Sequence, residues 1–195
     1  MIRDPVGLAT SFYEWVWRDV FSREELDVIL EMLEGDELEP GLLSRDNTVP
    51  NTDIRVTDIK MHHLNDENSW IFDRLDSAIH WANDNYYNFD LTGYNFFQYG
   101  VYDSAKGGHY GLHSDCFWGG KSVVNGLQRK LSMTVLLDDD YEGGEFVLQN
   151  GRRETIETVP GRAIMFPSFM IHGVERVTKG CRKSLVVWVL GPQWR

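Results

Sequence analysis

Two stretches in the first half of the chain repeat apolar residues at the spacing of an amphipathic helix. In FSREELDVILEMLEG the apolar residues recur every three or four positions, and Ser22 followed by Glu25 forms a capping-box sequence. Gly35 is a typical helix stop. A second run of this kind, over about residues 69–84, places its apolar residues on one helical face. The pattern therefore predicts two N-terminal helices.

The pattern changes to that of short strands after residue 94. Alternating or apolar runs are separated by turn sequences such as DDDYEGG, QNG and VPG. Roughly eight short strands at this spacing are typical of a β-sandwich or jelly roll. Residues 36–53 resemble a loop, residues 54–63 favour a strand, and FYEWVW within residues 1–20 favours an edge strand or a docking arm. We expect one α+β, mainly β domain over residues 1–195, helical to about residue 90.

The net charge and the cysteine content limit which partners and which cellular location we expect. The net charge is −11, so a polyanion meets a repulsive field and nucleic acid is a disfavoured partner. There are two cysteines, no signal-peptide pattern at the start and no run of about 18 apolar residues. We expect a cytoplasmic protein with reduced thiols and no membrane partner, and its oligomeric state stays open.

The stretch GHYGLHSDC contains a His-x-Asp pair, His113 and Asp115. Side chains two positions apart in an extended segment point the same way, so both can face one ion. His172, in FPSFMIHGVERV, supplies a third ligand type. Two histidines and one carboxylate are the facial set that binds non-haem Fe(II) and leaves coordination positions open. A structural zinc site usually needs four protein ligands.

A charged residue opens the otherwise apolar final strand, CRKSLVVWVL. Arg182 and Ser184 lie two positions apart and therefore on one face of this strand. A guanidinium beside a hydroxyl can bind a carboxylate through charge-assisted hydrogen bonds. An unpaired buried charge is costly, so a dicarboxylate ligand explains the arginine.

The order His-x-Asp, distal His and Arg-x-Ser resembles the 2-oxoglutarate- and Fe(II)-dependent oxygenases, and more narrowly their prolyl 4-hydroxylase-like branch. The resemblance covers about residues 94–190 and rests on FFQYGVYDSAKGGHYGLHSD, RKLSMTVLLDDDYEGGEFVL and VPGRAIMFPSFMIHGVERVTKGCRKSLVVWVL. It implies a double-stranded β-helix core of the jelly-roll or cupin-like type, over about residues 91–195, with N-terminal supporting helices. It also implies Fe(II), 2-oxoglutarate and O2, with ascorbate as a candidate reductant.

The resemblance further implies roles for individual residues. The iron ligands would be His113, Asp115 and His172, and Arg182 with Ser184 would bind the distal carboxylate of 2-oxoglutarate. Tyr99 and Tyr110 are candidates for a hydroxyl on the cosubstrate, and His109, Trp118 and Trp188 are candidates for substrate contacts. Two departures leave the substrate open: many collagen-type relatives have Lys in place of Arg182, and several have Tyr in place of Leu136.

The implied reaction is hydroxylation of a peptide or protein, with proline the favoured target, and release of succinate and CO2. Alternatives are a small-molecule or nucleic-acid hydroxylase of the same superfamily, a non-catalytic metal-binding β-sandwich, and a structural zinc protein. The glycine-rich segment over residues 117–128 is a hypothetical mobile lid. We interpret Arg129 and Lys130 as solvated residues at the start of a core strand rather than as substrate contacts.

Overall fold

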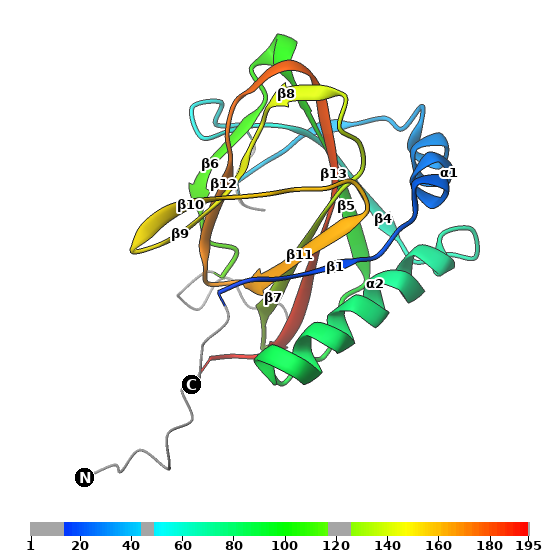
Figure 1. Ribbon diagram of the computed structural model, residues 1–195, viewed down its shortest axis with the longest axis vertical. Helices are drawn as coiled ribbons and strands as arrows, with labels where there is room; N and C mark the ends of the chain where they lie inside the picture. Colours follow the sequence, from blue (N-terminus) through cyan, green and yellow to red (C-terminus); the bar gives the residue numbers. More distant parts are fainter. Residues whose placement is uncertain (1–13, 44–48, 117–125, 195) are drawn as a thin grey trace.

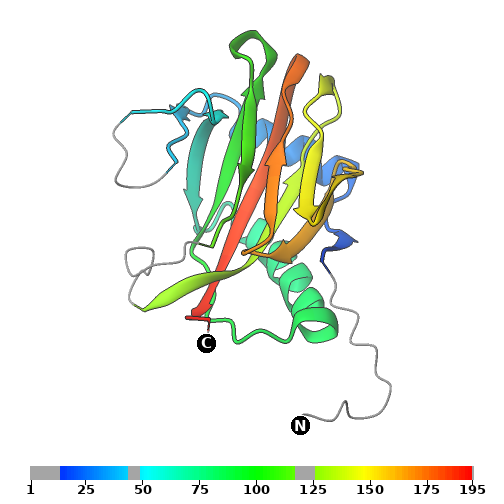
Figure 2. The ribbon, with the colours of Figure 1, turned by 90° about the vertical axis from the view of Figure 1, so that its left-hand side faces the viewer.

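Two antiparallel sheets face each other, and two helices cover the outer face of the larger sheet (Figures 1 and 2). The computed structural model describes residues 14–43, 49–116 and 126–194. In spatial order the larger sheet contains β1 (Val16–Asp19), β11 (Arg162–Pro167), β7 (Leu127–Leu136), β13 (Val177–Pro192), β5 (Phe96–Asp103), β4 (Asp58–His63) and β2 (Glu39–Pro40), and β8 (Tyr141–Gly143) pairs with β13. The smaller sheet contains β10 (Arg152–Ile156), β9 (Phe146–Asn150), β12 (Ile171–Val174), β6 (His109–His113) and β3 (Arg55–Val56). The expected mainly β, jelly-roll architecture is confirmed.

The first helix, α1 (Arg23–Leu33), begins at the predicted capping box. The backbone N–H of Glu25 donates to Ser22 Oγ at 3.2 Å, and the N–H of Ser22 donates to Glu25 Oε2 at 2.9 Å. These two bonds satisfy backbone donors that the first helical turn would otherwise leave open. Gly35, with φ of +86°, follows the last turn, as the sequence predicts.

The second helix, α2 (Ser69–Ala82), continues into a π-helical turn over Asn83–Tyr87. Its apolar stripe is fully buried, as the predicted helical face requires. The core between the helices and the larger sheet includes Leu26, Ile29, Ile71, Leu75, Ile79, Phe97, Tyr99, Met133, Leu185, Val187 and Val189. Both predicted helices are therefore supports for one sheet.

Strand β13 separates two environments through the alternation of its side chains. Leu185, Val187 and Val189 enter the core beneath the helices. The alternate residues, which include Arg182, Ser184 and Trp188, line a cavity between the two sheets. A second apolar core, with Phe146, Leu148, Phe166 and Val174 among its members, fills the remaining space between the sheets. Because successive side chains of a strand point to opposite faces, the cavity-lining residues of β13 all lie on the same face of the larger sheet.

The N-terminal third contributes strands as well as helices, which the sequence predicted only in part. Strand β1 pairs with β11 at the edge of the larger sheet, so the edge-strand alternative for FYEWVW is correct for the described residues. The segment expected to be a loop contains the short strand β2, and the strand expected over residues 54–63 is divided into β3 and β4. These two strands join different sheets, which brings Arg55 to the cavity.

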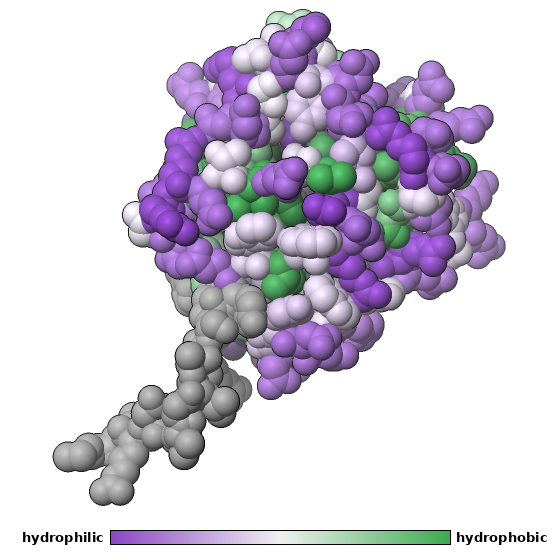
Figure 3. All heavy atoms as spheres, viewed as in Figure 1, coloured by the Kyte–Doolittle hydropathy of each residue, from purple (hydrophilic) through white to green (hydrophobic). Residues whose placement is uncertain are grey.

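The outer surface is mostly polar in the view of Figure 3, where apolar residues show only as small areas. Within the described residues, neither helix has the length and apolar character needed to cross a membrane.

Candidate metal centre

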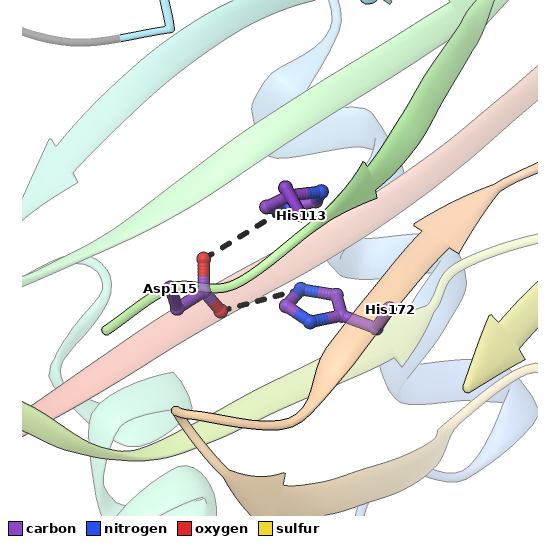
Figure 4. Close-up of side chains that lie close together, drawn as sticks. All are labelled: His113, Asp115 and His172. Carbon is purple, nitrogen blue, oxygen red and sulfur yellow. Dashed lines mark ion pairs between the residues drawn. The ribbon is translucent and has the colours of Figure 1, made fainter. Parts of the chain in front are cut away.

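Three side chains that line the cavity, those of His113, Asp115 and His172, lie close together (Figure 4). His113 is the last residue of β6, Asp115 follows two residues later, and His172 lies on the neighbouring strand β12. His113 and His172 are direct register partners across the two strands. One ligand atom from each of the three residues lies within 4.8 Å of the others. The sequence separated these residues widely, and the sheet pairing brings them together.

Both imidazoles present the same nitrogen to the common centre. Nδ1 of His113 is 2.9 Å from the carbonyl oxygen of Gly111, and Nδ1 of His172 is 3.0 Å from that of Met170. Each Nδ1–H therefore donates to a backbone carbonyl, which leaves Nε2 as the lone-pair donor. The two Nε2 atoms lie 3.8 Å and 3.3 Å from the Asp115 carboxylate oxygens. Such an arrangement could hold a divalent ion with three protein ligands.

The protonation states of the three residues suit a cation. Burial lowers the pKa of His113 to about 4, and the adjacent His172 adds to this effect. Burial alone would raise the pKa of Asp115, but His172, Arg129 and His113 together hold it well below its usual range. At neutral pH His113 is therefore neutral and Asp115 is ionised, as metal coordination requires.

The Asp115 carboxylate is held in place by residues of strand β7. Ser132 Oγ donates to Asp115 Oδ2 at 2.7 Å and contacts Ser168 Oγ at 2.9 Å. Arg129 Nη1 lies 3.5 Å from Asp115 Oδ1. Since Asp115 is only 5% exposed, these contacts fix the direction of the carboxylate as well as its charge.

Arg182 lines the same cavity and is almost completely buried, with 1% of its surface exposed. Its Nη1 donates to Ser184 Oγ at 3.2 Å, but Nε and Nη2 are buried and have no hydrogen-bond partner among the described residues. Leaving donors of a buried guanidinium unpaired is expensive. A ligand carboxylate in the cavity would satisfy both, so these residues fit a dicarboxylate cosubstrate.

Aromatic rings border the cavity beside the three converging side chains. The ring of Tyr110 stacks on that of His113, with centroids 3.6 Å apart. Trp188 also lines the cavity, and the guanidinium of Arg129 lies 3.9 Å above its ring. The indole N–H of Trp188 is buried, and no residue in the described part of the chain accepts a hydrogen bond from it. Tyr110 and Trp188 therefore occupy places that suit the cosubstrate or substrate contacts expected of them.

The structure does not place Tyr99 at the site. In β5 it pairs with Leu185 and shares that residue's face, in the core beneath the helices. Tyr102, which pairs with Arg182, lies on the cavity side instead. The expectation for Tyr99 is wrong because it overlooked which alternate residues of β5 face the second sheet.

Two other expectations for substrate residues have different outcomes. His109 does not line the cavity; its Nδ1 lies 2.8 Å from the carbonyl oxygen of Gly107, so its place argues against a substrate contact. Trp118 and most of the hypothetical lid lie outside the described residues. The interpretation of Arg129 and Lys130 as solvated is wrong: Arg129 pairs with Asp115, and Lys130 is 6% exposed with its ammonium 3.6 Å from the Trp194 ring.

Sequence reasoning also missed several residues of the cavity wall. Arg55, Gln98, Tyr102 and Thr134 line it together with the expected residues. Strand alternation from Ser184 could have indicated the residues of β5 once the strand pairing was known. No periodicity signal could have found Arg55, because β3 has only two residues.

Residues 97–190 match the model of the 2OG-Fe(II) oxygenase superfamily. This segment belongs to that superfamily. The oxygenase segment contains the metal-centre residues and Arg182, and only Arg55 among the cavity residues discussed lies outside it.

Curated relatives of the chain include PKHD-type hydroxylases. The protein from Picosynechococcus is 40% identical over 83 residues, which cover 41% of this chain and 36% of the relative. The protein from Idiomarina loihiensis is 36% identical over 87 residues, which cover 43% of this chain and 38% of the relative. The matched stretches thus span less than two-fifths of these relatives.

Solved structures of prolyl hydroxylases share the fold over most of the chain. A prolyl-4-hydroxylase from Pseudomonas putida superposes with a TM-score of 0.70 at 18% identity, covering 93% of this chain and 94% of that one. A Trichoplax adhaerens prolyl hydroxylase, solved with a peptide of the hypoxia inducible factor oxygen degradation domain, has a TM-score of 0.72 at 19% identity, covering 91% and 84%. The likeness extends the shared fold beyond the matched segment.

Proposed function

We propose that this protein is an Fe(II)- and 2-oxoglutarate-dependent dioxygenase that hydroxylates a peptide or protein, with proline the favoured target. One observation carries the proposal: a two-histidine, one-carboxylate centre opens onto the same cavity as the buried, unpaired donors of Arg182. The names of the PKHD-type and prolyl hydroxylase relatives support the choice of substrate class.

Each part of the site has a distinct task in this proposal. Nε2 of His113 and His172 and one oxygen of Asp115 would hold the Fe(II) ion. Nε and Nη2 of Arg182 would bind the distal carboxylate of 2-oxoglutarate, with Ser184 keeping the guanidinium in place. When bound, the metal and cosubstrate supply O2 activation, in which 2-oxoglutarate becomes succinate and CO2 and the substrate is hydroxylated.

The remaining residues of the site orient and shield it. Tyr110 packs on the face of His113 and limits its rotation, and its hydroxyl is the remaining tyrosine candidate for a cosubstrate contact. The hydrogen bond from Ser132 keeps Asp115 pointing toward the histidines, and Arg129 helps to keep it ionised. Phe146 and Phe166 form an apolar wall that excludes water from the cavity. These residues position groups rather than react.

The test begins with anaerobic protein loaded with Fe(II) and titrated with 2-oxoglutarate. We expect a visible metal-to-ligand charge-transfer band, and succinate once O2 is admitted, with and without ascorbate. His172→Ala should abolish the band because one of three metal ligands is lost. Arg182→Ala should shift it to roughly tenfold to hundredfold higher 2-oxoglutarate, since a charge-assisted carboxylate contact is removed.

The outcomes separate the proposal from its alternatives. A band without any succinate would indicate a non-catalytic binding module. Metal that resists chelation and ignores 2-oxoglutarate would indicate a structural zinc site. Screening proline peptides against small molecules and oligonucleotides for stimulated succinate release then decides among the hydroxylase classes. We also propose a reducing, cytoplasmic setting, because a chain with two cysteines has no disulfide framework.

A further inference from the structure

Arg55 is a second buried arginine of the cavity wall, on the opposite sheet from Arg182. It lies in β3 of the smaller sheet, directly opposite Tyr110 of β6, and is 7% exposed. It lines the same cavity as the metal-centre residues and Arg182. A guanidinium stays positively charged and donates hydrogen bonds in fixed directions. The group that pairs with Arg55 therefore helps to decide which ligands the cavity binds.

The surroundings of Arg55 hold its guanidinium in one position. Nε donates to Thr57 Oγ1 at 2.9 Å, and Nη1 donates to the carbonyl oxygen of Leu42 at 3.1 Å. Cζ lies 4.6 Å from the centre of the Tyr110 ring. A Cβ atom at Gly41 would approach Cζ to 2.7 Å, so a larger residue there would force the guanidinium to shift from this position. Among the described residues, Nη2 has no hydrogen-bond partner, and it is the open donor.

No carboxylate of the described residues lies within 4.0 Å of the Arg55 guanidinium, although the chain carries a net charge of −11. Two other arginines near the cavity have partners or a proposed ligand: Arg129 pairs with Asp115, and the donors of Arg182 would bind the cosubstrate. A buried cation without a counter-ion is costly, and among the described residues Arg55 has none, so a ligand anion in the cavity would stabilise it.

We propose that Arg55 binds a carboxylate of the substrate and thereby makes the enzyme selective for acidic substrates. The inference rests on the proposed function and specifies the substrate class of the same site. Tyr110 contacts both Arg55 and His113, so a carboxylate bound by Arg55 would lie in the same cavity, on the Tyr110 side of the metal centre. The carboxylate can come from an acidic side chain beside the target residue of a peptide, or from a free amino acid.

The experiment measures binding without turnover, on protein loaded with Mn(II) and 2-oxoglutarate. The probes are blocked proline peptides with aspartate at one flanking position, the matched asparagine peptides, and free L-proline against L-prolinamide. Tryptophan fluorescence reports each dissociation constant. We expect the wild type to bind at least one carboxylate probe roughly tenfold or more tightly than its amide match. The probe that shows the preference identifies the source of the carboxylate.

In Arg55→Gln, the carboxylate probe and its amide match should bind about equally well. The anaerobic cosubstrate band should still develop at the same 2-oxoglutarate concentration as in the wild type. Gly41→Ala should have the same effect with the arginine retained, because its Cβ displaces the guanidinium. The matched control is Arg23→Gln, the same change of charge at an exposed position on α1, which should leave the preference unchanged. The intact band shows that each variant is folded.

Two results would overturn the inference. One is a wild type that binds every carboxylate probe no better than its amide match. The other is a preference that survives in folded Arg55→Gln. Failure of the proposed function looks different, because it removes the cosubstrate band and the succinate from the wild type itself.

Discussion

Ser132→Ala tests how far the orientation of Asp115 depends on one hydroxyl of strand β7. The hydrogen bond is 2.7 Å long and accepted by a carboxylate, and Ser132 and Asp115 are 1% and 5% exposed. A buried bond of this kind contributes about 2 kcal/mol. For a chain of this size, the metal-free variant should therefore melt roughly 4–8 °C below the wild type.

The same substitution should weaken metal binding. With Oδ2 of Asp115 no longer held, we expect roughly tenfold to hundredfold lower affinity, as for other groups that support a metal ligand. Isothermal titration calorimetry with Mn(II) under anaerobic conditions measures it, and differential scanning calorimetry measures stability.

The matched control is Ser184→Ala on the adjacent strand β13. Ser184 is equally buried, but it accepts a hydrogen bond from Arg182 and not from a metal ligand. Its removal should raise the 2-oxoglutarate requirement and leave Mn(II) affinity unchanged. Unchanged metal affinity in Ser132→Ala, or an equal loss in both variants, would refute the reasoning that Ser132 acts through Asp115.

Three further outcomes follow from the structure. Gly144→Ala should lower the melting temperature, because Gly144 has φ of +67°, and raise the 2-oxoglutarate requirement, because the new Cβ would approach Cδ of Arg182 to 3.1 Å. A thermal melt checks the first effect and a titration of the anaerobic band checks the second. Burial raises the pKa of the Cys116 thiol, so at pH 8 iodoacetamide should modify it much more slowly in native than in denatured protein, as mass spectrometry of the digested peptide would show; equal rates would contradict its burial. Tyr99→Phe should leave the 2-oxoglutarate requirement unchanged, whereas an increase would return Tyr99 to the site.

The sequence predicted the features that depend on local chemistry. The capping box at Ser22 defines the start of α1 without help from the rest of the fold. The pairs His113 with Asp115, and Arg182 with Ser184, share a face because two-residue spacing in a strand requires it. The third ligand, His172, followed from the chemistry of the ligand set rather than from spacing.

Features that depend on strand pairing were beyond local reasoning. Tyr99 and Tyr102 lie in one strand, and only the register with β13 shows which of them faces the cavity. The local sequence around Arg129 predicts a solvated cation, and only the folded structure shows that it pairs with Asp115. Arg55 lies in a two-residue strand, and its role appears only when β3 pairs with β6.

The position of β13 has a consequence for biosynthesis. This strand follows all other described strands in the chain, yet it lies between β7 and β5 in the larger sheet. A ribosome-bound chain that lacks residues 177–192 therefore exposes the facing edges of β7 and β5, which are sites for pairing with other chains. Because Arg182 belongs to β13, the chain should gain its continuous larger sheet and the buried cavity arginine in one step.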